Sequence, residues 1–226
     1  MKELLDIKNL TVRYLGAEKE AVSNFSFTLG KGEILCLRGR SGSGKSTVAA
    51  AIMGLLNEYE AEASGEVLYR GENLLTLSDK DMRSIRWREI AMVPQSSMNA
   101  FNPVYTLSRT LREMMLLGDK SISKSEMRER ELMLMDMVHL DKKVLGCFAH
   151  EMSGGMKQRA AIALAMVYSP KILILDEATT GLDIKIQADV LGTLLSIKKK
   201  SNMAMLFISH DAILGDKLAD RKVEMP

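Results

Sequence analysis

The N-terminal part of the chain alternates apolar and polar residues, a period of two that is typical of strands with one buried face. The pattern covers Leu4 to Val12 and Ala21 to Thr28, and it ends at the turn GKG, residues 30–32. The segment Gly65 to Arg70, GEVLYR, indicates a further strand. We therefore expect an antiparallel β subdomain that includes the N-terminal residues.

Four short apolar segments indicate buried strands, because runs of this kind are typical of sheets that are covered on both faces. These segments are residues 33–38, 90–94, 171–175 and 203–209. Helices are expected between them, at residues 45–56, 78–87, 156–168 and 184–199. The alternation of strands and helices predicts an α/β fold with a largely parallel central sheet.

From about residue 104 to residue 150 the apolar residues instead recur with a period of 3.6, with charged residues on the opposite side. The clearest helix in this stretch is Lys124 to Val138. We expect residues 104–158 to form a helical subdomain, inserted into a single domain that spans residues 1–226.

The composition is that of a soluble globular protein, with 46% hydrophobic and 27% charged residues. The formal net charge of +2 gives no reason to expect nucleic acid as a partner. Cys36 and Cys147 lack the spacing of metal ligands and favour a reducing compartment. The longest uncharged apolar run, Ala160 to Tyr168, is far shorter than the roughly 18 residues that cross a bilayer.

The nine residues GRSGSGKST carry the clearest chemistry, because they match the phosphate-binding pattern G-x-x-x-x-G-K-[ST] after a strand and before a helix. Glycines let the backbone curl and point N–H groups at phosphate oxygens, and the helix N-terminus adds a positive dipole. We expect Lys45 to reach the β- and γ-phosphates and Ser46 to bind Mg²⁺. The expected cofactor-binding residues are Gly39, Arg40, Ser41, Gly42, Ser43, Gly44, Lys45, Ser46 and Thr47.

Polar side chains also follow three of the expected buried strands. Gln95 comes after residues 90–94, and its amide oxygen can bind Mg²⁺ or orient a water molecule. Asp176 and Glu177 come after residues 171–175, where Asp176 suits the Mg²⁺ site and Glu177 suits polarising the attacking water. His210 ends the last strand and can bind the γ-phosphate or the same water.

Two further segments allow two interpretations each on local sequence alone. Tyr14 can stack on an adenine ring or be an ordinary aromatic residue at a strand end, and the second is favoured. The segment Ser153-Gly154-Gly155 can bind a phosphate at a helix N-terminus or simply cap the helix, and again the simple interpretation is favoured.

Taken together, these residues resemble the ATP-binding subunit of an ABC transporter over nearly the whole chain. The matching motifs are a Walker A loop at residues 39–47, a Q-loop at Gln95, a signature SGGMKQR at residues 153–159, a Walker B strand ILILDE at residues 172–177, a D-loop ATTGLD at residues 178–183, a switch histidine at His210 and an A-loop aromatic at Tyr14. The signature is the specific element, since other phosphate-loop proteins lack it.

The segment PQSSMNAFNPVYTL, residues 94–107, is similar to that of the oligopeptide, dipeptide and nickel importer ATPases. This resemblance implies an energy-coupling subunit that powers uptake of peptides or nickel and other metal chelates, with ATP and Mg²⁺ as cofactors. The implied partners are a second ATP-binding subunit, two transmembrane permeases and an extracytoplasmic solute-binding protein. The implied location is the cytoplasmic, inner face of the cell membrane.

The resemblance also implies a P-loop NTPase core of the RecA-like type, and a head-to-tail dimer that sandwiches ATP. One subunit would contribute its Walker A loop, and the other would contribute Ser153, Gly154, Gly155 and Met156, with Asp183 of the D-loop nearby. Glu177 would then be the catalytic base and His210 the γ-phosphate sensor. Met152, Met156 and Ala178 depart from many family members, which have Leu, Gln and Pro there.

Other classes of protein fit the sequence less well. An ABC ATPase of DNA repair would need an inserted coiled coil between Gln95 and Ser153, and the interval is too short. A translation-type ABC protein would need two nucleotide domains in one chain. A module that binds ATP without hydrolysing it would not need Glu177 and His210.

Overall fold

The structure is a computed structural model that describes residues 3–56, 59–95, 97, 101–210 and 212–226. Its contacts divide the chain into two compact units. The first unit contains Met1–Met92, Lys171–Glu177 and Asn202–Pro226, and the second contains Val93–Pro170 and Ala178–Ser201. The expected helical subdomain at residues 104–158 falls within the second unit, and its bounds stay a prediction.

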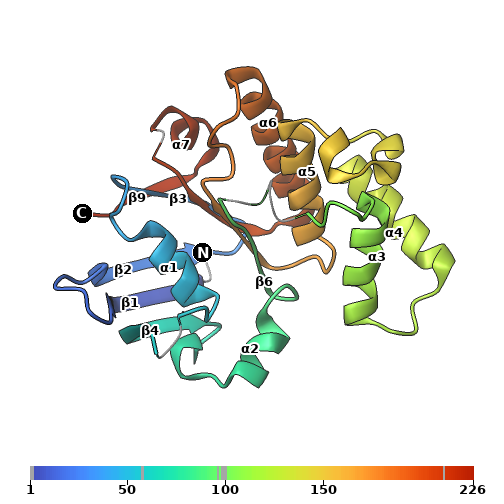
Figure 1. Cartoon of the computed structure of the whole chain (residues 1–226). Coiled ribbons are helices and arrows are strands. Elements are labelled where there is room, and N and C mark those ends of the chain that lie inside the picture. The colour runs from blue at the N-terminus through green and yellow to red at the C-terminus, as the bar shows by residue number, and fades with distance from the viewer. Residues whose placement is uncertain (1–2, 57–58, 96, 98–100, 211) are drawn as a thin grey trace. The chain divides into compact units, whose positions relative to one another are not determined.

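An antiparallel sheet forms one part of the first unit, with the strand order β2-β1-β4-β5. Its strands are β1 (Glu3–Tyr14), β2 (Val22–Gly30), β4 (Ala61–Tyr69) and β5 (Glu72–Asn73). Figure 1 shows β1 between β2 and β4. The alternating N-terminal pattern therefore predicted this sheet correctly. The strand expected at Gly65 begins four residues earlier, because the exposed residues before it also pair with β1.

A sheet of five strands forms the other part of this unit, in the order β6-β7-β8-β3-β9. The strands are β3 (Ile34–Arg38), β6 (Ile90–Val93), β7 (Ile172–Asp176), β8 (Ala204–Ile208) and β9 (Arg221–Glu224). Pairs β3–β8, β7–β8 and β3–β9 are parallel, and β7 and β8 are buried throughout. The registers Leu37–Ile208 and Asp176–Ile208 bring the carboxyl ends of β3, β7 and β8 to one edge.

The described residues of the first unit include the α-helices α1 (Lys45–Ile52), α2 (Asp79–Ile85) and α7 (Ala212–Leu218) and a short 3-10 turn at Leu74–Thr76. One apolar core joins α1 to both sheets, with Ile7, Val48 and Leu206 among its members. Helix α1 ends four residues before the predicted Leu56, because Gly54 adopts a φ of 59° that an α-helix does not allow.

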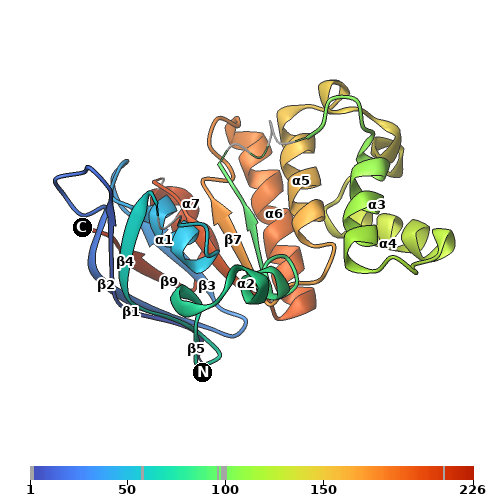
Figure 2. The ribbon, with the colours of Figure 1, turned by 60° about the horizontal axis from the view of Figure 1, so that its bottom comes forward.

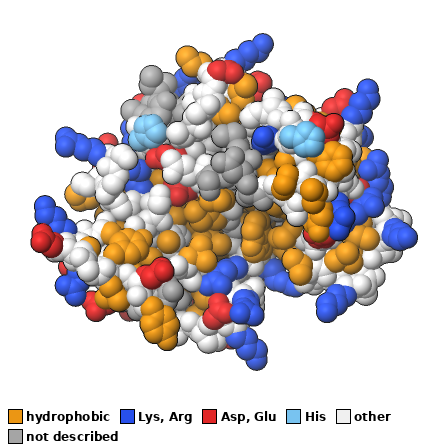
Figure 3. All heavy atoms as spheres, viewed as in Figure 1, with side chains coloured by type: hydrophobic (Ala, Val, Ile, Leu, Met, Phe, Trp, Pro, Cys, Tyr) orange, Lys and Arg blue, Asp and Glu red, His pale blue; other side chains and the backbone are white. Residues whose placement is uncertain are grey.

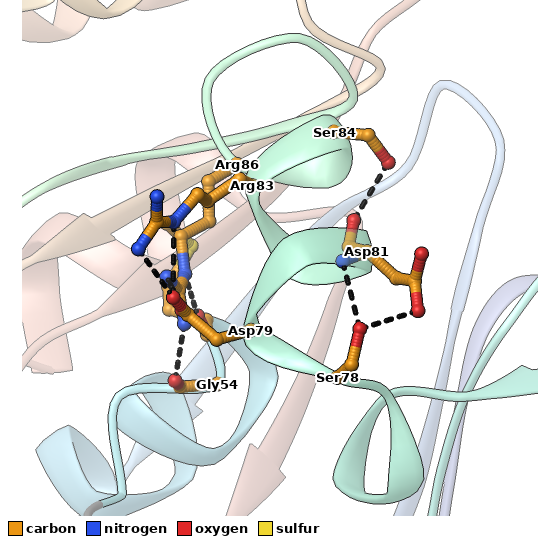
Figure 4. Close-up of polar contacts among 8 residues, drawn as sticks. Gly54, Ser78, Asp79, Asp81, Arg83, Ser84 and Arg86 are labelled. Carbon is orange, nitrogen blue, oxygen red and sulfur yellow. Dashed lines mark hydrogen bonds and ion pairs between the residues drawn. The ribbon is translucent and has the colours of Figure 1, made fainter.

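Arg86 holds the carboxyl end of α1 (Figure 4). Its Nε donates to the carbonyl of Met53 at 2.8 Å, its Nη2 donates to that of Gly54 at 2.5 Å, and its Nη1 pairs with Asp79 at 3.0 Å. In the same view Ser78 caps α2 by accepting from the N–H of Asp81. The guanidinium thus satisfies two carbonyl groups just beyond the helix.

The second unit is helical, and Figure 2 shows α3 against α4 and α5 beside α6. Short 3-10 turns occupy Lys142–Gly146 and Ala149–Glu151. Each predicted helix of this unit is present, with ends within three residues of the expected ones. The observed bounds are α3 (Leu107–Gly118), α4 (Lys124–Met137), α5 (Gly154–Ala165) and α6 (Ile184–Ser201).

A buried carboxylate links α3 and α4. Glu131 of α4 is fully buried and accepts hydrogen bonds from Arg112 Nε at 2.7 Å, Arg112 Nη2 at 3.1 Å, Ser108 Oγ at 2.5 Å and Arg128 Nη1 at 3.2 Å. Burial alone would raise the pKa of Glu131, but the hydrogen bonds from Arg112, Ser108 and Arg128 outweigh it and the pKa lies below its ordinary value.

The surface carries charges of both signs, as the blue and red side chains on the face in Figure 3 show, with hydrophobic side chains between them. Large apolar side chains that are exposed include Leu117 and Met133 of the second unit. Among the described residues, no helix combines the length and the apolar content that a membrane crossing requires.

Candidate functional site

The phosphate loop follows β3 and leads directly into α1, as its sequence predicts. Gly44 starts the helix with a φ of 90°, and a Cβ there would lie 2.0 Å from the carbonyl oxygen of Ala21. Only glycine fits this position without a clash. Within the described structure no side chain caps α1, and its first turn contains no acid. The N–H groups and the positive dipole at this end are therefore suited to an anion.

Lys45 lies within the curve of this loop. Its Nζ donates to the carbonyl oxygens of Gly39 at 2.9 Å and Arg40 at 2.7 Å, and the residue is only 5% exposed. The ammonium group therefore lies inside the loop, where it is suited to pairing with phosphate oxygens.

Asp176 ends β7 beside this loop. It is 4% exposed, its Oδ1 has no hydrogen-bond partner, and its side chain is hydrogen-bonded to Ser46. Burial raises the pKa of Asp176, the Ser46 hydrogen bond opposes this, and the charge of Glu177 adds to it. A nearby cation would relieve this unfavourable burial of charge.

A carboxylate and a hydroxyl beside a phosphate pocket fit Mg²⁺, which prefers oxygen ligands and keeps several waters. Among the described residues there is no group of three or more His, Cys, Asp or Glu side chains that could hold a metal ion by itself. Ser46 and the unpaired Oδ1 of Asp176 are the side-chain groups here that could bind such an ion, together with phosphate oxygens and water.

Glu177 follows at the carboxyl edge of the sheet. Its backbone has a φ of 48°, which is uncommon for a residue with a side chain, and its N–H donates to the carbonyl of Ile208 at 3.0 Å. This hydrogen bond anchors the turn to β8. His210 follows the same strand, and its Nδ1 lies 3.3 Å from Glu177 Oε1. The structure therefore brings together the two residues that were predicted to act on water and on the γ-phosphate.

Tyr14 ends β1 next to the start of α1. Its hydroxyl lies 3.3 Å from Thr47 Oγ1, and the residue is 39% exposed. A partly exposed ring held beside the phosphate loop suits stacking on a nucleotide base, the interpretation that local sequence alone did not favour.

The remaining predicted residues lie in the second unit. Ser153 accepts a hydrogen bond from the N–H of Met156 at 3.3 Å and caps α5. Gly155 lies against α6, where a Cβ would be 2.4 Å from Ile186 Cγ2. Asp183 accepts from the N–H of Ile186 at 2.9 Å at the start of α6, and Gln95 is exposed after β6.

Two groups of predicted residues thus emerge. The first unit itself brings together Tyr14, the phosphate loop, Asp176, Glu177 and His210. That Gln95, the α5 cap with Gly154, and Asp183 complete a nucleotide site stays a prediction. Gln158 lies inside the segment SGGMKQR, but no sequence pattern indicated that it is buried against Ser97, because that contact joins segments 61 residues apart.

Comparisons with known proteins identify the family and the fold of the chain. The family model described as "ABC transporter" matches residues 22–180. The chain is 38% identical over 227 residues to the oligopeptide transport ATP-binding protein OppD of Bacillus subtilis, covering 98% of this chain and 63% of that protein. It is 40% identical over 224 residues to the metal-staphylopine import system ATP-binding protein CntD of Staphylococcus aureus, covering 98% of this chain and 82% of that protein.

A solved structure shows the same fold. It is a dimeric, post-hydrolysis state of the ATP-binding cassette MJ0796 bound to ADP and Pi, with a TM-score of 0.83 and 26% identity. The match covers 98% of this chain and 94% of that chain. The predicted architecture, a P-loop core with antiparallel β and helical parts, is confirmed.

Proposed function

The chain belongs to the ABC transporter family of ATP-binding proteins, and we propose that it is the ATP-hydrolysing subunit of an importer for peptides or metal chelates. The observation that carries this proposal is the edge of the parallel sheet in the first unit. There a glycine-rich phosphate loop, the buried Asp176 with its unpaired oxygen, and the Glu177–His210 pair follow adjacent strands.

ATP would bind with its phosphates in the loop and its adenine on Tyr14. The backbone N–H groups of residues 39–47 and Nζ of Lys45 would hold the β- and γ-phosphates. Ser46 and Asp176 would hold Mg²⁺, with Gln95 as a further ligand. The ion would neutralise negative charge on the phosphates.

Glu177 would act as the base. Its carboxylate accepts a hydrogen bond from a water molecule and takes a proton as the water oxygen bonds to the γ-phosphorus. The bond between that phosphorus and the bridging oxygen of ADP breaks, which releases ADP and phosphate. His210 lies beside Glu177 and would donate a hydrogen bond to the γ-phosphate.

A second ATP-binding subunit would complete each site. Helix α5 is capped by Ser153 and has no acid in its first turn, so its N-terminus is suited to the γ-phosphate of an ATP held by another subunit. Gly154, Gly155 and Met156 would approach the same phosphate, and Asp183 would lie at the interface. The MJ0796 cassette, which shares this fold, is dimeric with ADP and Pi bound.

The names of the relatives support a proposal for the transported solute and the membrane partners. OppD is named for oligopeptide transport and CntD for metal-staphylopine import, and the chain spans 63% of the first and 82% of the second. We therefore expect uptake of peptides or metal chelates, including nickel complexes, through two permeases with an extracytoplasmic binding protein. The subunit would work at the cytoplasmic face of the membrane.

Replacing Glu177 with glutamine tests the hydrolytic role. The amide keeps the shape of the side chain but cannot accept the proton, so kcat should fall by about 10² to 10⁴ while ATP binding remains. Phosphate release and ATP titration measure the two quantities. Glu113→Gln, at an exposed residue of α3, is the matched control and should leave both unchanged. An unchanged kcat in Glu177→Gln would remove the residue from this role.

Replacing Ser153 with arginine tests the shared site. The bulky cation should block the approach of a second subunit, so ATP-dependent dimers should be lost while each chain still binds ATP. Ser123→Arg is the control, because Ser123 also caps a helix, α4, outside the predicted site. Light scattering in the Glu177→Gln background measures dimerisation. Dimers that persist in Ser153→Arg would contradict the shared site.

A further inference from the structure

A buried hydrogen bond inside the second unit joins two segments that are far apart in the sequence. Ser97 Oγ donates to Gln158 Oε1 at 3.1 Å, across 61 residues. Ser97 is 3% exposed and Gln158 is 1% exposed. Ser97 lies two residues after Gln95, and Gln158 lies on α5, the helix that Ser153 caps.

This contact is a poor source of stability. Nε2 of Gln158 is buried and has no hydrogen-bond partner among the described residues. Exchanging the oxygen and nitrogen of the amide would still leave one polar end without a partner. An unpaired buried polar group is unfavourable, and two apolar side chains could pack in this place without that penalty. The pair is therefore better suited to fixing one arrangement than to stabilising the fold.

The next residue along α5 makes a second connection. Arg159 Nη1 donates to the carbonyl of His139 at 2.9 Å, just beyond the end of α4. Consecutive residues of one helix thus hold two different segments, one after β6 and one after α4. A shift of α5 would be passed to both.

We propose that Gln158 is a positioning residue that, by holding Ser97, keeps Gln95 at a fixed spacing from the Ser153 end of α5. Gln158 lies five residues from the cap, about 7.5 Å along the helix axis. Loss of this contact would let Gln95 and the α5 cap change their spacing, which would lower the rate of ATP hydrolysis more than the binding of ATP. This inference rests on the proposed function.

Three variants of the full chain test this role. Gln158→Met has a similar length and no polar end, Ser97→Ala removes the donor, and Ser97→Thr keeps it. In Gln158→Met and Ser97→Ala we expect kcat for ATP hydrolysis to fall about tenfold, with KM for ATP changed less than about twofold. Ser97→Thr should retain kcat near that of the parent.

Two further measurements separate positioning from a structural role. The thermal midpoint of Gln158→Met should stay equal to or above that of the parent, since the variant removes an unpaired polar group. The double variant Ser97→Ala/Gln158→Met should lose no more activity than either single variant, because both remove the same contact. Thr193→Val removes another buried hydroxyl from the same unit, one bonded within its own helix, and should leave kcat unchanged.

The outcomes are distinguishable. A parent chain that hydrolyses no ATP would overturn the proposed function and this role with it. An active parent with an unaffected kcat in Gln158→Met, or with losses that multiply in the double variant, would overturn only the positioning role.

Discussion

Replacing Glu131 with glutamine removes a charge from the interior of the helical unit and keeps the volume of the side chain. The carboxylate accepts two hydrogen bonds from Arg112, one from Arg128 and one from Ser108. A glutamine can still accept on its oxygen, but its NH₂ group would face a guanidinium donor. We expect α3 and α4 to be held together less strongly as a result.

The size of the effect follows from the exposure of the partners. Breaking a fully buried ion pair costs about 3–5 kcal/mol. The side chains of Arg112 and Arg128 are 40% and 51% exposed, so water can solvate both guanidinium groups once the carboxylate is lost. We therefore expect a loss of about 2 kcal/mol in the free energy of unfolding at pH 7, or roughly 4–8 °C in melting temperature.

Urea unfolding followed by circular dichroism measures this difference. Glu113→Gln on α3 is the matched control, since its ion pair with Arg109 is exposed and its loss should cost less than about 0.5 kcal/mol. A Glu131→Gln variant as stable as the Glu113→Gln variant would show that the hydrogen bonds of Glu131 do not hold α3 and α4 together, and would refute the reasoning.

The stability difference between the parent and Glu131→Gln should also depend on pH. The pKa of Glu131 is lower in the folded chain than its ordinary value of 4.5, so its contribution to stability is fully present above pH 4.5. That contribution is lost as the pH falls through the folded pKa. The difference between the parent and Glu131→Gln should therefore be constant near neutral pH and shrink in acid.

The remaining predictions concern the helix that starts at the phosphate loop and the ring beside it. Arg86→Ala should lower the free energy of unfolding by about 2 kcal/mol, because two carbonyl groups beyond α1 lose their donor. The control Arg83→Ala removes an exposed ion pair and should lower it by less than about 0.5 kcal/mol in the same urea titration. Tyr14→Ala should weaken ATP binding about three- to tenfold, while Tyr14→Phe should bind nearly as well as the parent in a fluorescence titration; equal affinities in both variants would argue against stacking.

The sequence predicted correctly those parts of the fold in which neighbouring residues share one environment, such as strands that are buried on both faces. The strands β7 and β8 are buried on both faces, so their apolar runs are unambiguous. The phosphate loop was predictable because its glycines meet a steric requirement, as the close approach of Gly44 to Ala21 shows. The carboxyl-edge positions of Asp176 and Glu177 followed from the strand before them.

Other structural features depend on contacts between segments that are distant in the sequence, so no local sequence pattern predicted them. Strand β9 reads RKVE and is mostly exposed, so only its pairing with β3 makes it a strand. Glu131 lies in a highly charged helix sequence, where a carboxylate is expected to face solvent, and its burial depends on the arginine of a different helix. The Ser97–Gln158 pair likewise requires two segments to meet in the fold.

The left-handed backbone of Glu177 has a consequence for protein engineering. A residue with a side chain in this conformation costs about 1 kcal/mol or more, which glycine would largely avoid. Screens that select this chain for heat resistance alone would therefore favour Glu177→Gly and discard the carboxylate. Substitutions that raise the melting temperature of this ATP-binding subunit are better sought at positions far from this turn. At such positions a gain in stability is not expected to lower kcat for ATP hydrolysis.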